Sequence, residues 1–237
     1  MAGAPFSPKA LSFLRALARN NRREWFHAHR EQYELHLRTP ITAVIERLGE
    51  EFRHFAPEQM ADPKRSLYRI WRDTRFSPDK RPLKTNVAAV FPHRDGDRHT
   101  SAGFYLEIAP KWVFAGGGLY RPERPALVRI RERIASDPRA FRRVSESPGM
   151  KKMGGLKGEQ LARVPRGYPA DHPAAEYLRF KQFVAFREWP PELATSPRFW
   201  PELLSTLRAV APLVAYLNTT LHARGVAAPL IPRAPRV

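Results

Sequence analysis

The chain of 237 residues contains no cysteine. This absence excludes disulfide bonds, thiolate metal ligands and a cysteine nucleophile, and it fits a reducing compartment, so we expect a cytoplasmic protein. No run of residues approaches the roughly 18 apolar residues that span a bilayer, and Met1 to Phe6 lack the basic and apolar segments of a secretory signal. The sequence therefore predicts a protein that is not anchored to a membrane.

Negative charge is also scarce. The chain has 23 Asp and Glu residues against 41 Lys and Arg, which gives a formal net charge of +18. Such a charge produces a field that attracts polyanions, unless the charges cancel locally. The basic residues are mainly arginine, and Ala and Pro are abundant, so a compositional bias of the genome is the alternative explanation. The sequence leaves open whether the charge is functional.

The apolar content is that of a folded protein. Hydrophobic residues make up 43% of the chain and aromatic residues 11%, whereas charged residues make up 27%, which does not favour disorder. One core can still organise a chain of this length, so we expect a single domain over residues 1–237. Its C-terminal tail, 224–237, is expected to be frayed.

Apolar residues at helical spacing predict helices at both ends of the chain. Ser7 followed by Pro8 is typical of a helix start. A second helix from about Arg22 should end before Pro40, because the residue before a proline disfavours the helical backbone. Further helices are expected at about 41–55, 127–134, 138–144 and 173–181, and as a pair that begins near 197 and is interrupted at Pro212.

The middle of the chain predicts a sheet. Alternation of apolar with other residues, clearest from Ala102 to Ile108, indicates strands, and the connections are too short for crossover helices. The strands are expected at 67–76, 85–91, 102–108 and 112–115, with a further one at 183–189. We therefore predict an α+β fold: an antiparallel sheet of about four to six strands, with N-terminal and C-terminal helices packed mainly against one face.

Charged side chains are dense at the end of the first expected strand and in the loop after it. Arginine binds phosphate or carboxylate through two parallel hydrogen bonds, lysine adds a point charge, and backbone N–H groups complete an anion site. Gly117 lets the backbone approach a ligand closely, and Pro165 and Gly167 hold Arg166 in a constrained backbone. We therefore predict an anion-binding site, with Arg166 folding over the first loop. Its residues are Arg72, Asp73, Arg75, Lys80, Lys84, Thr85, Gly117 and Arg166.

A structural role is the alternative for these residues. Asp73 and Asp79 would then neutralise neighbouring Arg and Lys side chains and tie the loop to the sheet. The run of three glycines at 116–118 would be a flexible exit from a strand, since it lacks the spacing and the lysine of a phosphate-binding loop.

Motifs for metal binding and catalysis are missing. The eight histidines form no HExxH motif, and His27 and His29 point to different faces of a helix. No GxSxG motif or dinucleotide-binding fingerprint occurs. The sequence predicts no metal and no cofactor, and it identifies no catalytic residue.

Short segments along the chain form an ordered pattern. They are Phe13-Leu14, Asn20-Asn21, Trp25-Phe26, Arg69-Ile70, Arg72 to Phe76, Asp79-Lys80, Pro82, Lys84-Thr85, Gly116 to Gly118, Ile130-Arg131, Arg163 to Tyr168, Asp171 to Pro173, Leu178 and Lys181. In this order they resemble the bacterial and fungal family known as domain of unknown function 2461, over nearly the whole chain. The resemblance implies one domain, but no particular activity, substrate or cofactor.

Three hypotheses on function remain open. The first is an anion-binding domain that acts on nucleic acid or a nucleotide through the basic strand and loop, where aromatic residues alternate with arginine. The second is an enzyme that acts on a small phosphorylated or carboxylated substrate. The third is a structural or protein-interaction module, which would need a large apolar patch.

Overall fold

A computed structural model describes residues 3–96 and 100–222 of the chain, and its centre is a four-stranded sheet. Neighbouring strands are antiparallel throughout, in the order β1-β2-β3-β4, so the predicted α+β fold with an antiparallel sheet is confirmed. The predicted tail at 224–237 lies outside the described residues. The strands are β1 (Val87–Phe91), β2 (Gly103–Ile108), β3 (Val113–Leu119) and β4 (Phe183–Trp189).

The prediction of a regular strand at 67–76 is wrong. Only isolated bridges occur there: Leu67 pairs with Ala89 at the edge of β1, and Trp71 pairs with Leu83. Between the latter two residues the chain forms a long loop, residues 71–83, which we call the finger. Prolines at 78 and 82 cannot donate ladder hydrogen bonds, and the charged residues of the loop bond to one another, so the alternating pattern does not continue as a strand.

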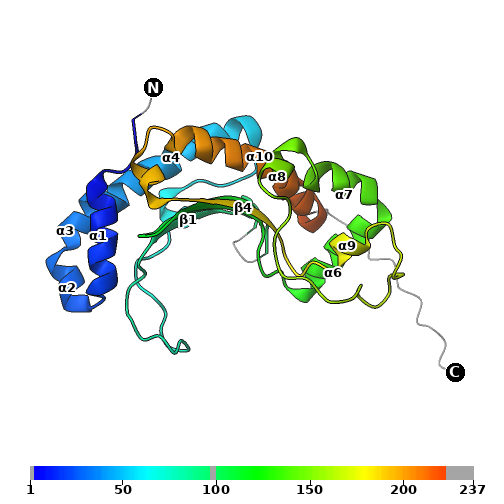
Figure 1. The fold of residues 1–237 in the computed structure, drawn as a ribbon, viewed down its shortest axis with the longest axis horizontal. Helices are drawn as coiled ribbons and strands as arrows, with labels where there is room; N and C mark the ends of the chain where they lie inside the picture. Colours follow the sequence, from blue (N-terminus) through cyan, green and yellow to red (C-terminus); the bar gives the residue numbers. More distant parts are fainter. Residues whose placement is uncertain (1–2, 97–99, 223–237) are drawn as a thin grey trace.

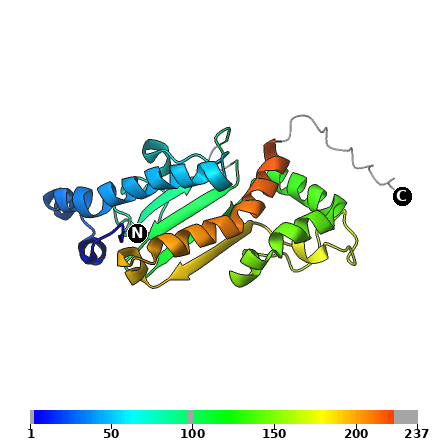
Figure 2. The same ribbon diagram turned by 90° about the horizontal axis from the view of Figure 1, so that it is seen from above.

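Two long helices cover one face of the sheet and leave the other face open (Figures 1 and 2). They are α4 (Thr39–Phe55) and α10 (Phe199–His222), and they lie side by side across the strands. Phe52 of α4 contacts Phe91 and Phe104 of the sheet, with ring centroids 5.3 and 5.1 Å apart. The helices thus pack mainly against one face, as predicted, because that face carries the buried apolar side chains.

Shorter helices extend the molecule at both ends of the sheet and give it the shape of an arch (Figure 1). The N-terminal end holds α1 (Pro8–Arg19), α2 (Arg23–Ala28), α3 (Arg30–Tyr33) and the π-helical turn η1 (Glu34–Arg38). The other end holds α6 (Arg124–Ser136), α7 (Pro138–Ser145), α8 (Pro148–Lys152) and α9 (Ala175–Leu178). A short α5 (Pro63–Ser66) and the 3-10 turn η2 (Pro191–Thr195) complete the described elements.

Prolines interrupt the helices less than the sequence predicts. Helical backbone continues from Arg30 to Phe55, and the π-helical turn before Pro40 removes the need for the hydrogen bond that a proline cannot donate. Pro212 lies inside α10, which runs on to its end with a change of direction (Figure 2).

The segment 147–181 also differs from the prediction. The short helix α8 is not among the helices that the sequence predicts, and α9 is shorter than the expected helix at 173–181. Helix α9 ends early because the backbone after it pairs with another segment of the chain: the amide of Lys181 donates to the carbonyl oxygen of Glu159.

Candidate functional site

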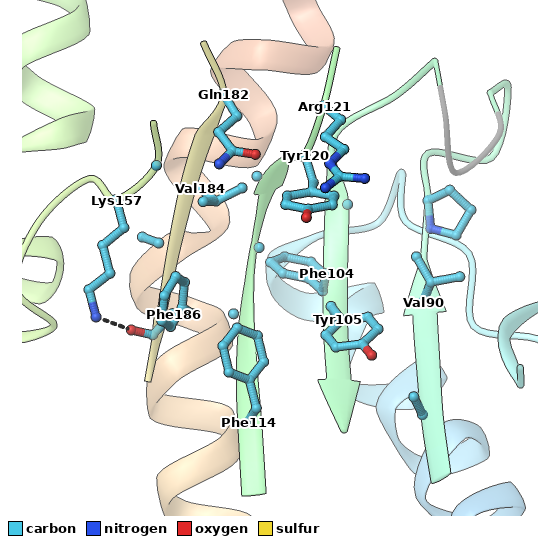
Figure 3. Close-up of a pocket in the computed structure, with 18 of the residues that line it drawn as sticks. Val90, Phe104, Tyr105, Phe114, Tyr120, Arg121, Lys157, Gln182, Val184 and Phe186 are labelled. Carbon is cyan, nitrogen blue, oxygen red and sulfur yellow. Dashed lines mark hydrogen bonds between the residues drawn. The ribbon is translucent and has the colours of Figure 1, made fainter. Parts of the chain in front are cut away.

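The open face of the sheet carries a groove with a volume of about 930 Å³. Side chains alternate along each strand, so the register decides which of them line it. The pairing places the side chains of Val90, Tyr105, Phe114 and Phe186 on this face, opposite the face covered by α4 and α10. Figure 3 shows this groove from the open side.

Four aromatic rings form a row across the open face, and we call it the aromatic row. Its members are Tyr68, Tyr105, Phe114 and Phe186, which come from the segment beside β1 and from β2, β3 and β4 in turn. Successive ring centroids are 6.3, 5.9 and 4.6 Å apart. Rings at these separations contact one another: the first two pairs meet edge to face, and Phe114 and Phe186 are tilted by 34°.

A lysine lies over the ring at each end of the aromatic row. The Lys84 ammonium is 4.5 Å from the centroid of Tyr68, and the Lys157 ammonium is 4.2 Å from the centroid of Phe186. Lys157 also donates a hydrogen bond of 2.9 Å to the carbonyl oxygen of Phe186 (Figure 3). Positive charge therefore flanks the aromatic surface on both sides.

Tyr120 and Arg121 line the groove directly after β3, away from the aromatic row (Figure 3). Tyr120 is 61% exposed, and the guanidinium of Arg121 lies 5.2 Å from its ring centroid. Arg121 has a φ of 51°, which makes it the single non-glycine residue with positive φ in the described part of the chain. Strained backbone of this kind clusters at ligand sites. The Arg121 guanidinium is thus a third cation at the groove, after Lys84 and Lys157.

The floor between these two groups is glycine backbone. Gly103, Gly116 and Gly118 lie on the open face, where the neighbouring strands come too close to leave room for a Cβ atom. Gly117 faces the other way, since a Cβ there would lie 2.8 Å from the ring of Phe104 and 3.1 Å from Val210. Glycine at these positions therefore lets the strands pair closely and adds no side chain to the floor of the groove.

A carboxylate lies beside the aromatic row, next to Tyr105. The Tyr105 hydroxyl donates to Glu107 at 2.7 Å, and the Trp112 indole donates to the same carboxylate at 3.0 Å. Burial and the neighbouring carboxylate raise the pKa of Tyr105 above its ordinary value. The phenol thus stays protonated and remains a donor to Glu107.

The sequence-predicted residues of the finger are paired with one another. Arg75 lies 2.7 Å from Asp73 and lowers the pKa of that carboxyl to about 2. Arg72 lies 2.6 Å from Asp79, whose pKa is held low by Arg81 first and by Arg72 second. The finger is thus braced by internal ion pairs.

The remaining predicted residues fall on both sides of the groove. Lys84 and Gly117 line it, Thr85 follows Lys84 in the chain, and Lys80 donates to the carbonyl oxygen of Thr74 within the finger at 3.0 Å. Arg166 is exposed, in a turn where the amide of Tyr168 donates to the carbonyl oxygen of Pro165. The loop that contains it, residues 161–174, lies at the opposite end of the arch from the finger (Figure 1). The structure therefore does not fold Arg166 over the first loop. Whether these residues bind a ligand stays a prediction.

Sequence reasoning missed most of the groove. Its aromatic and cationic members beyond Lys84 were not singled out: Tyr105, Phe114, Phe186, Tyr120, Arg121 and Lys157. The signal was present in the strands, because a strand with one apolar face places its alternate residues on the other face. Applied to the strand 102–108, this rule selects Tyr105 and Glu107.

Two features are absent from the described part of the chain. Within residues 3–96 and 100–222 no three His, Asp or Glu side chains lie close enough together to hold a metal ion. Over the same residues, no helix combines the length and the apolar character needed to cross a membrane.

The fold and the groove define a class: an α+β protein with helices on one face of an antiparallel sheet and an aromatic, cation-flanked groove on the other. The chain belongs to the family described as conserved hypothetical protein (DUF2461), whose model matches residues 9–216. Comparisons with curated proteins and with solved structures gave no significant match.

Proposed function

We propose that the open face of the sheet binds single-stranded nucleic acid. The observation that carries the proposal is the aromatic row with a lysine over each end. Proteins that bind single strands combine aromatic side chains, on which bases stack, with positive charge along the sugar–phosphate backbone. The groove offers both groups on one surface.

A single strand fits this surface better than a duplex does. Bases reach the floor of the groove only when they are unpaired and turned toward the sheet, since in a duplex they stack on one another. Four rings in a row suit several successive bases, whereas the cations stand at the ends of the row and beside Tyr120, where a backbone would pass. The net charge of +18 adds long-range attraction for a polyanion.

The test is the affinity for a fluorescently labelled oligothymidine, measured by anisotropy at several salt concentrations. We expect Phe186→Ala to weaken binding about 5- to 150-fold, because one base–ring stack contributes about 1–3 kcal/mol. Leu35→Ala is the matched control, since Leu35 is 65% exposed and lies on η1, outside the groove. Melting curves of both variants check that they are folded.

A second pair of variants tests the charges. Lys157→Ala should reduce the slope of log affinity against log salt by about 0.7, the value for one phosphate contact on a single strand. Lys152→Ala removes the same charge from α8, outside the groove, and should leave the slope nearly unchanged. No binding at about 50 mM salt, where basic grooves hold nucleic acid, would overturn the proposal. So would equal losses in Phe186→Ala and Leu35→Ala. If thymidine monophosphate displaces the oligothymidine completely and binds with the same affinity as the oligomer, the groove is instead a site for a single nucleotide.

A further inference from the structure

The tip of the finger exposes an aromatic ring. Phe76 is 94% exposed, which is the highest value for any large hydrophobic side chain in the described residues. The guanidinium of Arg75 lies 5.8 Å from its ring centroid. An exposed phenylalanine loses the free energy that burial provides, about 1.5–3 kcal/mol. The fold itself gives no packing reason for this ring.

The finger holds this ring on a braced support. At its base, Trp71 bridges to Leu83 and packs on Phe26, with ring centroids 5.5 Å apart. The Asn21 side chain bonds both backbone groups of Leu83, at 2.9 and 3.0 Å. The base of the finger is thus fixed to the N-terminal helices.

Further along the finger, Arg72 ties its two arms together. Its amide donates to Pro82 at 2.9 Å, and its guanidinium contacts Asp79 at 2.6 Å and Ser77 at 3.3 Å. Bonds between the arms restrict the tip before any ligand arrives, so little conformational entropy is lost when it binds.

The finger also begins where the aromatic row ends. Tyr68 and Lys84 flank its base, and both line the groove. The finger projects from this edge on the open side of the arch (Figure 1). A strand that follows the aromatic row past Tyr68 therefore arrives at the finger.

We infer that the finger recognises the junction between a single strand and a duplex, with Phe76 stacked on the last base pair. Apolar side chains that insert at base steps, accompanied by arginine, are a recurrent device in nucleic-acid binding. The tip suits this use better than membrane insertion, because its one apolar ring stands among the charges of Asp73, Arg75 and Asp79. The inference rests on the proposed function and adds the class of ligand: a duplex with a single-stranded tail.

The experiment measures the binding of four labelled DNA ligands to the full chain. They are a single strand, a blunt duplex, and two versions of that duplex that carry the same single strand as a tail, one at the 5′ end and one at the 3′ end. We expect one of the tailed duplexes to bind at least about 5-fold more tightly than the single strand, the gain from one additional base–ring stack. Phe76→Ala should abolish this preference and leave the affinity for the single strand unchanged. Phe76→Trp should keep it, and Leu35→Ala is again the control. A 2-aminopurine in the terminal base pair should change its fluorescence on binding of the wild type but not of Phe76→Ala.

The outcomes separate this inference from the proposed function. If the single strand binds but neither tail is preferred, or if Phe76→Ala keeps the preference, the junction inference is wrong and the proposed function stands. If the single strand does not bind, the proposed function fails and the junction inference fails with it. If the blunt duplex binds as tightly as the tailed duplexes, only the junction inference is wrong. Sedimentation with vesicles of phosphatidylglycerol that is lost in Phe76→Ala would assign the ring to a membrane and would also overturn the inference.

Discussion

The glycines of β3 make a graded prediction about stability. Gly118 has a φ of +129°, and a Cβ there would press against the carbonyl oxygen of Phe183 on β4. Gly116 has no positive φ, but its Cβ would press against the carbonyl oxygen of Ala185. Gly155 has a φ of +73° and nothing within 4 Å of its Cβ position. Alanine at these positions therefore tests backbone conformation and strand contact separately.

The expected magnitudes follow from the two effects. Gly155→Ala has only the conformational cost of a left-handed residue, about 1–2 kcal/mol. Gly116→Ala has only the cost of overpacking, about 1–3 kcal/mol, because backbone on β4 cannot rotate away as a flexible side chain can. Gly118→Ala has both costs, so we expect its free energy of unfolding to fall by about 2–5 kcal/mol.

Thermal unfolding followed by circular dichroism measures the three effects. For a protein of this size 1 kcal/mol lowers the Tm by about 2–4 °C. Gly118→Ala should therefore lower the Tm by about 4–20 °C and Gly155→Ala by about 2–8 °C. If Gly155→Ala destabilises as much as Gly118→Ala, or if Gly116→Ala is neutral, then the close approach of β3 and β4 is not what requires glycine there.

Two further predictions concern side chains that tie segments together. The pair with Arg75 lowers the pKa of Asp73 to about 2, against an unperturbed 3.8. Any stabilisation of the fold by this pair is therefore present above about pH 4 and is lost as the pH falls through about 2. Titration of the carboxyl by NMR checks this, and a measured pKa near 3.8 would show that the pair does not form. Asn218 of α10 is 1% exposed and bonds both backbone groups of Ala102, at 2.9 and 3.0 Å. Asn218→Ala should lower the free energy of unfolding by about 1–3 kcal/mol for each group left without a partner, measured by urea denaturation, and an unchanged midpoint would contradict the role.

Local patterns in the sequence were sufficient for most of the sheet. Strands expected at 85–91, 102–108, 112–115 and 183–189 all occur, because apolar alternation and tight turns depend on neighbours in the chain. The expected strand at 67–76 does not form, because its charged residues bond to one another and to the loop that follows. Asp73 accepts from the amide and the guanidinium of Arg75, and Arg72 bonds to Asp79, which offers the backbone an alternative to the ladder.

The candidate site was harder to predict than the fold. Charge density in the loop after Arg72 predicts an anion site, but density does not reveal pairing: Asp73 and Asp79 form ion pairs with three guanidinium groups there. Of the eight residues expected to bind a ligand, Lys84 and Gly117 line the groove. The loop 161–174, which contains Arg166, lies across the arch from the finger (Figure 1). The packing of the helices at that end sets this separation, and periodicity along the chain does not predict it.

The groove itself depends on register between strands. Gly116 pairs with Tyr105 on one side and with Phe186 on the other, so two rings flank a position that has no side chain. Each of β2, β3 and β4 contributes one ring to the open face, and the other aromatic residues of β2 and β4 lie at positions that alternate to the opposite face. A shift of one residue in the pairing would turn Phe114 toward α10 and place Gly117 on the open face, because side chains alternate with a period of two. The aromatic row and the glycine floor therefore arise together from the pairing of three strands.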